Sequence, residues 1–445
     1  MSINLQTAHF VVIGAGETGR SIINYLNYHQ AKLLHVLDTR VTPPQITGVD
    51  VIGGALSYAN LATADVIVIS PGVSIYEPVL QQALSAGKQV VGDIELFAQA
   101  IQTWPSKVIA ISGSNGKTTV TSLTGFLAES AGISTLVAGN IGTPVLEAWI
   151  LAEQRQQYPE LIVLELSSFQ LEVTYSLQCV SSTVLNISED HLDRYRDLLE
   201  YAYVKANIFN HSQVQVLNQA DPLVMAMLRT NLSQITFAAN DPNFGLSEIA
   251  GKLWLKAAGE MYLATDELQL VGRHNYMNVL ASLALLDAAG YALEQFKRGL
   301  TKFAGLEHRM QKVCEQAGVL FIEDSKGTNV GAVIAGVDGI DRPIHLILGG
   351  DGKGQDFTPL RELVQRKCKS VALIGQDAAK LAEVLRGCAN VARYATLPEA
   401  VSACINQAMA GDAVILSPAC ASWDMFSNYK QRAQVFIDSI YAHLK

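Results

Sequence analysis

The chain of 445 residues has few cysteines, no long apolar run and a small share of charged residues. Its six cysteines form no CxxC pair and show no zinc-type spacing, which argues against a disulfide framework or a common zinc site and favours a reducing compartment. No apolar run reaches the roughly 20 residues that span a bilayer, and the opening residues MSINLQTAHF lack the form of a signal peptide. We therefore expect a cytoplasmic protein with no membrane insertion.

The charge balance also excludes some partners. A formal net charge of -9 gives no general attraction to nucleic-acid phosphates, so we expect no nucleic-acid partner, and an anionic substrate must meet local basic groups. Apolar residues make up 49% and charged residues 16%, which is enough for packed cores and argues against disorder. Because one core rarely exceeds roughly 250 to 300 residues, we expect two or three domains, with three preferred.

Strand-like apolar runs alternate with helical stretches in three blocks, the pattern of βαβ units with parallel strands. The first block contains HFVVIGAG, LLHVLDTR and DVIVISPG. The second contains KVIAISGSNGKTT, STLVAGN, LIVLELSS and STVLNISED, a hairpin-like stretch around LWLKAAGEMYLAT and the amphipathic run HNYMNVLASLALLDAAGY. The third contains GVLFIEDSKGT, RPIHLILGGDGKG, SVALIGQD and DAVILSPACAS. Interruptions at TWPS and AGLEHR predict α/β domains at 1–100, 101–305 and 306–445.

The strongest chemical signal is a glycine-containing loop that follows the predicted strand Val108–Ile111 and precedes a predicted helix. The loop consists of Gly113, Ser114, Asn115, Gly116, Lys117, Thr118 and Thr119. Backbone N–H groups and a helix N-terminus that converge in this way bind phosphates, with Lys117 on the β- and γ-phosphates and Thr118 on Mg²⁺. The general P-loop pattern requires glycine where this chain has Ile111, so only the shorter GxxGKT form is present. An ordinary glycine turn is the alternative, and the strand–loop–helix context disfavours it.

A second loop, Gly14-Ala15-Gly16-Glu17-Thr18-Gly19, has the form of a dinucleotide-binding fingerprint, and Asp38 ends the next strand about 20 residues later. Alone, this pattern suggests NAD and a dehydrogenase. The same loop binds any diphosphate at a helix N-terminus. We favour a diphosphate, because the chain continues into an ATP-type loop where a dehydrogenase is expected to place its catalytic acid.

Two residues at predicted strand ends are candidate metal ligands. Glu165 ends the strand in LIVLELSS, and His191 follows the strand in STVLNIS, so both are expected at the carboxyl edge of the sheet. Together with Thr118 they offer oxygen and imidazole ligands for Mg²⁺ beside the phosphate loop. Taken singly, Glu165 reads as a helix-capping group and His191 as a loop histidine.

An ordered set of motifs spans most of the chain and closely resembles the Mur ligases. The motifs are GSNGKTT, GNIGTP, LELSSFQLE, NISEDHLDRY, HNYMN, LEHR, DSKGTN, GGDGKG and SPACASWD. GAGETG, DTR, GDIELF and LSPACASWDMF are most like the branch that adds D-glutamate. The resemblance implies a Rossmann-like UDP-binding domain, a central P-loop ATPase-like mononucleotide-binding domain and a Rossmann-like C-terminal domain that binds the amino acid.

The resemblance also implies the site residues. The sugar nucleotide is expected at Thr18, Thr39, Arg40, Ser70, Gly72 and Asn140. ATP is expected at loop 113–119 with Asn275, Asn278, Arg309 and Asp324, and D-glutamate at Lys326, Thr328, Lys353, Ser422 and Tyr429, the last in place of a phenylalanine. Two Mg²⁺ sites are implied, one with Thr118 and Glu165 and one with His191, beside Lys205 as a carbamate formed from CO₂. Without the resemblance, Lys205 reads as a surface lysine.

The implied enzyme is an ATP-dependent amide-bond ligase of peptidoglycan precursor synthesis, and hence of cell wall formation, cell shape and cell division. Its substrates are UDP-N-acetylmuramoyl-L-alanine, D-glutamate and ATP, its intermediate is an acyl phosphate, and its catalytic residues are Lys117, His191 and Lys205. We expect a monomer that closes by a pivot near Ala304–Glu307. The alternatives are a sister ligase that adds another amino acid, a nucleotide-sensing module without catalysis, and an NAD-dependent dehydrogenase.

Overall fold

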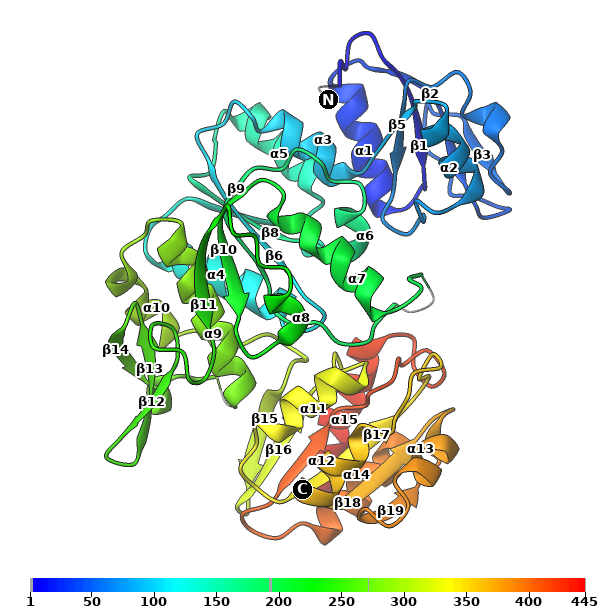
Figure 1. Cartoon of the computed structure of the whole chain (residues 1–445). Helices are drawn as coiled ribbons and strands as arrows, with labels where there is room; N and C mark the ends of the chain where they lie inside the picture. Colours follow the sequence, from blue (N-terminus) through cyan, green and yellow to red (C-terminus); the bar gives the residue numbers. More distant parts are fainter. Residues whose placement is uncertain (1–2, 192–193, 271, 445) are drawn as a thin grey trace. The chain divides into compact units, whose positions relative to one another are not determined.

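The computed structural model describes residues 3–191, 194–270 and 272–444 (Figure 1). The chain divides into two compact units, one of residues 1–267 and 278–301 and one of residues 268–277 and 302–445. The division falls inside one long helix, between Met277 and Asn278. None of the helices in the described parts of the chain has the length and apolarity that crossing a bilayer requires.

The N-terminal part of the first unit is a parallel sheet in the order β3-β2-β1-β4-β5. Its strands are β1 His9–Ile13, β2 Lys32–Asp38, β3 Val51–Gly53, β4 Val66–Ile69 and β5 Gln89–Val91, and its helices are α1 Glu17–Tyr28, η1 Tyr58–Asn60, α2 Pro78–Ser85 and α3 Asp93–Ala100. The strand order reverses at β1, so a crevice for ligands is expected beyond its carboxyl end. A Cβ on Gly19 would lie 1.8 Å from the carbonyl oxygen of Gly14, so the third fingerprint glycine lets α1 approach the turn.

The central part of this unit is a six-stranded parallel sheet in the order β11-β10-β9-β6-β8-β7. Its strands are β6 Lys107–Ser112, β7 Thr135–Gly139, β8 Leu161–Glu165, β9 Cys179–Val184, β10 Ser212–Asn218 and β11 Ser233–Phe237. The helices are α4 Lys117–Ser130, α5 Val145–Arg155, α6 Ser168–Leu171, α7 Leu198–Lys205, η2 Ala206–Phe209 and α8 Pro222–Met225. Because β6 lies between β8 and β9, the loop that follows it opens among the carboxyl ends of both neighbours.

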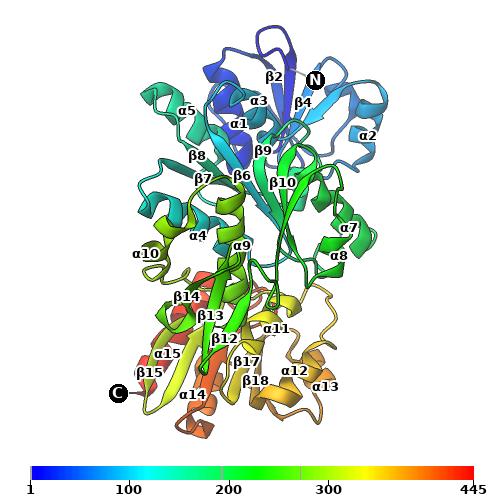
Figure 2. The same ribbon diagram turned by 60° about the vertical axis from the view of Figure 1, so that its left-hand side comes forward.

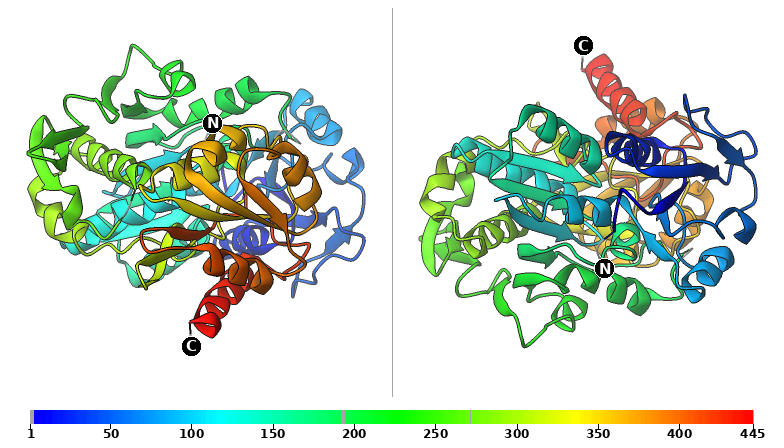
Figure 3. Two further views of the ribbon diagram at one scale, coloured as in Figure 1. Left: turned by 90° about the horizontal axis from the view of Figure 1, so that it is seen from below. Right: turned by 90° about the horizontal axis from the view of Figure 1, so that it is seen from above.

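A small antiparallel sheet, β12-β13-β14, completes the first unit (Figure 3). Its strands are β12 Leu246–Ile249, β13 Lys252–Ala257 and β14 Glu260–Ala264, and the remaining helices are η3 Thr265–Glu267, α9 Arg273–Ala288, η4 Leu293–Phe296 and α10 Lys297–Leu300. The predicted hairpin is therefore confirmed as β13–β14. The additional strand β12 was not predicted.

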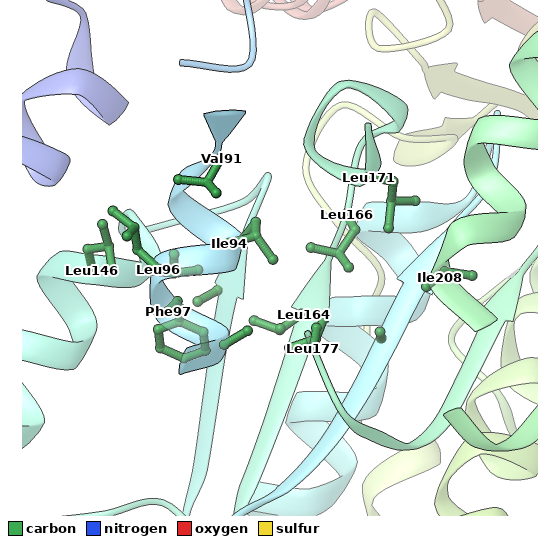
Figure 4. Packing of buried hydrophobic residues seen from close by; sticks show 14 of the residues in the cluster. Val91, Ile94, Leu96, Phe97, Leu146, Leu164, Leu166, Leu171, Leu177 and Ile208 are labelled. Carbon is green, nitrogen blue, oxygen red and sulfur yellow. The ribbon is translucent and has the colours of Figure 1, made fainter. Parts of the chain in front are cut away.

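The N-terminal and central sheets share one hydrophobic core (Figure 4). Apolar side chains of α3, among them Ile94 and Phe97, are buried in the same cluster as Leu164 of β8 and Leu177. This shared core explains why the two blocks form a single compact unit. The predicted domain boundaries at residues 100 and 305 stay predictions.

The second unit is a doubly wound α/β fold with the sheet order β15-β16-β20-β17-β18-β19 (Figure 2). Its strands are β15 Gln311–Gln316, β16 Val319–Glu323, β17 Ile344–Gly349, β18 Cys368–Ile374, β19 Asn390–Arg393 and β20 Ala413–Leu416. Its helices are α11 Val330–Asp338, α12 Leu360–Lys367, α13 Ala378–Val384, α14 Leu397–Gln407 and α15 Tyr429–His443. Alternate residues of β17 enter two cores, Leu346 and Leu348 under α11 to α13 and Ile347 under α14 and α15. The antiparallel strand β15 is an edge strand that the expected parallel pattern did not include.

Candidate active site

The phosphate loop connects β6 to α4, as predicted, and its shape depends on two glycines. Gly113 has φ of +146° and Gly116 has φ of +84°, a region that side chains rarely adopt. A Cβ on Gly113 would lie 3.1 Å from Leu185, and one on Gly116 would lie 2.8 Å from Oδ1 of Asn278. The loop therefore runs as bare backbone to Lys117, where α4 starts and its positive dipole end begins.

A neighbouring asparagine braces this loop. The carbonyl oxygen of Asn186 accepts the N–H of Ser114 at 2.9 Å. Its side-chain amide accepts the N–H of Asn115 at 2.8 Å and donates to the Asn115 carbonyl oxygen at 3.0 Å. Ser188 adds a bond from its N–H to Oγ of Ser114 at 2.9 Å. These bonds fix the loop before any ligand binds, which is the preorganisation that phosphate binding benefits from.

Two lysines donate to the same carbonyl oxygen of the loop. Nζ of Lys117 donates to the carbonyl oxygens of Gly113 at 2.7 Å and Ser114 at 3.0 Å. Nζ of Lys205, at the end of α7, donates to the same Gly113 oxygen at 3.1 Å and to Oγ of Ser112 at 3.3 Å. Lys205 is only 1% exposed and lies over the Tyr201 ring, so the surface reading of this residue is wrong.

Burial is the main reason why the pKa of Lys205 lies well below its usual value. The charge of Lys117 lowers this pKa further, whereas Asp190 and Glu165 act in the opposite direction. The uncharged form of this amine is therefore more populated than in an exposed lysine. An uncharged amine is the form that reacts as a nucleophile.

Glu165 ends β8 and carries a carboxylate oxygen that protein groups do not satisfy. The side chain is 2% exposed, and its Oε1 accepts from Nδ2 of Asn140 at 2.9 Å. Its Oε2 is buried and has no hydrogen-bond partner within the described residues. A buried, unpartnered carboxylate oxygen is costly unless a cation or donor satisfies it, so the residue fits a metal ligand.

His191 lies on the loop beyond β9. Its φ is +55°, and its carbonyl oxygen accepts the N–H groups of Arg194 at 2.9 Å and Tyr195 at 3.2 Å. The imidazole packs edge-on against Phe169 with 4.7 Å between ring centroids, and its Nε2 is 3.6 Å from Oδ2 of Asp190. Over the described parts of the chain, no three His, Cys, Asp or Glu side chains gather as a metal cluster. The predicted metal set holds only two residues of these types, Glu165 and His191.

Five of the six candidate sugar-nucleotide residues lie beyond the carboxyl ends of β1, β2 and β4. Thr18 lies in the first turn of α1, and Thr39 and Arg40 follow β2, whereas Asn140 follows β7 of the central sheet. Ser70 packs against the first fingerprint glycine, since a Cβ on Gly14 would lie 2.5 Å from its Oγ, and Gly72 follows in the same loop. Gly16 and Arg40 line an open cavity of about 440 Å³.

The role expected of Asp38 in a dinucleotide site is not available to it in this structure. Its oxygens accept from the N–H of Ala15 at 2.8 Å and from Nε and Nη2 of Arg40 at 2.7 Å each. These bonds, the one from the Arg40 side chain foremost, hold the pKa of Asp38 far below its usual range. Asp38 thus braces the loop and Arg40, and the NAD interpretation loses its ribose ligand.

The candidate ATP residues are divided between the units. Asn278 belongs to the first unit beside Gly116, whereas Asn275, Arg309 and Asp324 belong to the second. Asp324 is buried, and its carboxylate accepts from Oγ of Ser417 at 2.6 Å and from the N–H of Met310 at 3.1 Å. Burial raises the pKa of Asp324 to about 7.

Three loops at the carboxyl ends of β16, β17 and β20 are joined by backbone hydrogen bonds. Ala419 donates to the carbonyl oxygen of Gly327 at 2.9 Å, and Asp351 and Ala421 exchange bonds of 3.0 and 2.8 Å. These contacts bring together the loops that carry the candidate D-glutamate residues Lys326, Thr328, Lys353 and Ser422. Nζ of Lys326 lies 4.1 Å above the ring of Tyr429, the first residue of α15.

Comparison with known proteins assigns the family. Residues 8–92 match the Mur ligase MurD-like N-terminal domain, residues 111–286 the Mur ligase middle domain, and residues 308–420 the Mur ligase glutamate ligase domain. The chain is 49% identical to UDP-N-acetylmuramoylalanine–D-glutamate ligase of Chromobacterium violaceum, over 98% of this chain and 97% of that protein. The chain belongs to the Mur ligase family. The ligase of the same name from Nitrosomonas europaea is 44% identical over 98% and 97% of the two chains.

Solved structures of other Mur ligases have the same fold as this Mur ligase. MurF from Acinetobacter baumannii superposes with a TM-score of 0.63 at 17% identity, covering 97% of this chain and 91% of that one. UDP-N-acetylmuramate-alanine ligase from Thermotoga maritima gives 0.59 at 16% identity, covering 98% and 100%. At such identities the likeness concerns the three-domain α/β fold alone.

Two residues of this Mur ligase that support the site were missed in the sequence. Asn186 opens the motif NISEDHLDRY, in which only His191 was predicted as a site residue. Arg432 is fully buried in α15 and donates to the carbonyl oxygens of Cys420 at 3.1 Å and Ser325 at 2.8 Å, which joins two of the three loops. An arginine in an amphipathic helix usually lies on the surface. No local signal in the sequence therefore indicated that Arg432 is buried.

Proposed function

We propose that this Mur ligase joins D-glutamate to UDP-N-acetylmuramoyl-L-alanine, with conversion of ATP to ADP and phosphate, in peptidoglycan precursor synthesis. The observation that carries the proposal is the 49% identity, along nearly the whole chain, to a ligase named for these substrates. The preorganised phosphate loop, its two lysines and the unpartnered oxygen of Glu165 support an ATP-dependent reaction.

ATP is proposed to bind with its phosphates on loop 113–119. Lys117 then exchanges its contacts with the loop carbonyls for the β- and γ-phosphates, where its charge offsets the charge of the transferring group. Asn275 and Asn278 of α9, with Arg309 and Asp324, are proposed to hold the adenine and ribose. Asn278 belongs to the first unit and the other three residues to the second. We propose that the chain closes by a pivot near Ala304–Glu307.

Two Mg²⁺ sites are proposed beside the loop. Thr118 and Glu165 would hold one ion, and the unpartnered Oε2 of Glu165 supports this assignment. His191 would hold the other. When bound, Mg²⁺ neutralises the charge on the phosphoryl oxygens, so that an anionic carboxylate can approach.

Lys205 is proposed to carry a carbamate. The uncharged amine attacks CO₂, one N–C bond forms, and the nitrogen loses a proton to solvent, which leaves an anionic oxygen pair on the side chain. The lowered pKa of Lys205 favours the reactive amine, and the nearby charge of Lys117 favours an anionic product. The negative oxygens would then face the metal sites and the ammonium of Lys117.

The reaction follows from these positions. A carboxylate oxygen of the L-alanine end forms a bond to the γ-phosphorus while the bond to the ADP oxygen breaks, which gives an acyl phosphate. The amine of D-glutamate attacks the acyl carbon and forms the C–N bond, which gives a tetrahedral intermediate. This intermediate re-forms the carbonyl as its C–O bond to phosphate breaks, and a proton leaves the nitrogen. Water must be excluded until this step, because it hydrolyses the acyl phosphate.

The substrates have separate sites in this proposal. Thr18, Thr39, Arg40, Ser70 and Gly72 are proposed to bind the UDP part, and Asn140 the part near Glu165. The joined loops of the second unit are proposed to bind D-glutamate, with Lys326 and Lys353 on its carboxylates and Thr328, Ser422 and Tyr429 around them. We further propose that the enzyme works as a monomer in the cytoplasm, and that it serves cell shape and division through the wall.

The test is phosphate release from ATP in the presence of UDP-N-acetylmuramoyl-L-alanine and a panel of amino acids. D-Glutamate is expected to support turnover and to appear in the product. Turnover with a different amino acid would assign the chain to a sister ligase. Absence of turnover with every amino acid would contradict the proposed function.

A further inference from the structure

Arg194 lies at a junction that the proposed reaction does not use. Its guanidinium forms an ion pair with Glu172, through Nε to Oε1 at 3.0 Å and through Nη2 to Oε2. The side chains of the pair are only 8% and 1% exposed. Oη of Tyr195 also donates to Oε1 of Glu172 at 2.7 Å. A buried pair with this many bonds has fixed geometry, since displacing either partner leaves an uncompensated buried charge.

The same guanidinium holds the loop that carries Ser70 and Gly72. Nη1 of Arg194 donates to the carbonyl oxygen of Pro71 at 3.0 Å, and Nη2 donates to that of Val73 at 3.1 Å. These two carbonyls flank Gly72, a candidate contact of the sugar nucleotide. Arg194 therefore fixes the backbone of the candidate loop on both sides of one of its residues.

Arg194 also contacts His191 by two routes. Its backbone N–H donates to the carbonyl oxygen of His191 at 2.9 Å, which helps to hold that residue at positive φ. Its guanidinium stacks 4.0 Å from the centre of the Phe169 ring, which forms a T-shaped contact with the imidazole of His191. An open cavity of about 390 Å³ is lined by Gly72, Phe169 and Arg194, among others, so the substrate loop and this stack border the same space.

We propose that Arg194 is a positioning residue that holds the sugar-nucleotide loop and His191 in one fixed arrangement, so that binding at the loop and placement of His191 are coupled. This inference rests on the proposed function, because it takes the loop as the substrate site and His191 as a metal ligand. Only arginine meets the requirement, since its planar fork reaches Glu172 and two carbonyls at once and stacks on a ring. Lysine keeps the charge but offers a single nitrogen.

The experiment compares Arg194→Lys with Arg196→Lys in the full chain. Arg196 is the matched control, because it lies two residues away with a side chain that is 83% exposed and paired with Glu200. Phosphate release gives the KM for UDP-N-acetylmuramoyl-L-alanine, the KM for ATP and the Mg²⁺ concentration for half-maximal rate. Arg194→Lys is expected to raise the KM for UDP-N-acetylmuramoyl-L-alanine and the required Mg²⁺ concentration by roughly tenfold, the scale of a lost charge-assisted hydrogen bond. Its KM for ATP is expected to stay within about twofold of the native value. Arg196→Lys is expected to resemble the native chain.

A purely structural role predicts a different result. A folded Arg194→Lys chain with a lower melting temperature and native KM values would overturn the proposal, and so would equal losses for both nucleotides. If the native chain itself released no phosphate, this result would contradict the proposed function. The coupling through Arg194 is contradicted separately, by native KM values in a variant of an active enzyme.

Hydrogen exchange of the native chain supplies a measurement that needs no variant. Addition of UDP-N-acetylmuramoyl-L-alanine without ATP is expected to slow exchange at the amide of Val73 and at those of Arg194 and Tyr195, which bond to His191. If Arg194→Lys does not fold, this measurement on the native chain tests the coupling instead. Protection confined to the loop of Val73 would contradict the coupling.

Discussion

Lys117 and Lys205 donate to the same oxygen, the carbonyl of Gly113, at 2.7 and 3.1 Å. Two ammonium groups this close repel each other, and the repulsion adds to burial in lowering the pKa of Lys205. A nucleotide that draws Lys117 toward its phosphates and a carbamate on Lys205 would each relieve the repulsion. The proximity of the two lysines therefore favours an anion close to Gly113.

Lys117→Ala tests the division of labour along the chain. Turnover should be abolished, because the phosphoryl group loses the cation proposed to stabilise it. UDP-N-acetylmuramoyl-L-alanine should still bind, since all but one of its candidate residues lie beside the N-terminal sheet. Initial rates and calorimetric titration with the sugar nucleotide measure the two properties. Loss of sugar-nucleotide binding to the same degree would contradict the assignment of separate sites.

The sequence predicted the phosphate loop and the three α/β blocks because these depend on local signals. Short stretches of sequence identify apolar runs of strand length and glycines that adopt positive φ, such as Gly113 and Gly116. The burial of Lys205 and the position of Arg432 inside the second unit arise from packing between distant segments. No local pattern distinguishes such residues from surface cations, so only the family resemblance identified Lys205, and nothing identified Arg432.

The contacts of Asp38 depend on a neighbour that the fingerprint does not include. The spacing from the fingerprint correctly placed an acid at the end of β2, but Arg40 lies two residues further on and binds both carboxylate oxygens. The motif predicts that an acidic residue is present at this position. Whether that carboxylate binds a ligand or a neighbouring side chain such as Arg40 depends on the folded geometry.

Asp324→Asn should make the stability of the chain less dependent on pH. The pKa of Asp324 is raised by burial to about 7, above an unfolded value of about 3.9, so the folded state binds more protons between these values. The free energy of unfolding of the native chain therefore falls as pH rises from about 4 to about 7. The variant has no such charge to bury, so its advantage over the native chain should grow by on the order of 1 kcal/mol per pH unit across this window.

Denaturant unfolding at a series of pH values measures this difference. Asp341→Asn is the control for the loss of one charge, because the side chain of Asp341 is 99% exposed in the same unit. A stability difference between Asp324→Asn and the native chain that stays constant from pH 4 to 8 would refute the buried-charge account. Asp324→Asn should also bind ATP more weakly if Asp324 holds the ribose. ATP affinity therefore tests the proposed function of Asp324 separately from its effect on stability.

The amino-acid site should discriminate by handedness. D-Glutamate is expected to support ligation, whereas L-glutamate and meso-diaminopimelate are not, because Lys326 and Lys353 are proposed to take two carboxylates in one arrangement. Competition assays with radiolabelled amino acids measure the ratio of kcat/KM values. Efficient use of either competitor would transfer the chain to a sister ligase, and Tyr429→Phe then tests whether the phenol hydroxyl contributes to the choice.

The last prediction concerns the carbamate proposed on Lys205. Lys205→Ala should be nearly inactive, because the buried space beside Glu165 and Lys117 loses its proposed anion. Formate or acetate should restore part of the activity, since a small carboxylate fits the vacated space and supplies the same pair of oxygens. Lys205→Arg should stay inactive under these conditions, because its guanidinium fills the space with a cation that takes no CO₂.

Phosphate release at increasing formate, in buffer depleted of CO₂ and of other carboxylates, measures the rescue. Restored rates should saturate with formate for Lys205→Ala alone, and the native chain should lose activity as CO₂ is removed. Near-normal activity of Lys205→Ala in this buffer would eliminate the carbamate, while the ligase assignment would remain. The outcome therefore separates the chemistry of one buried lysine from the identity of the reaction, which rests on the family and the substrates.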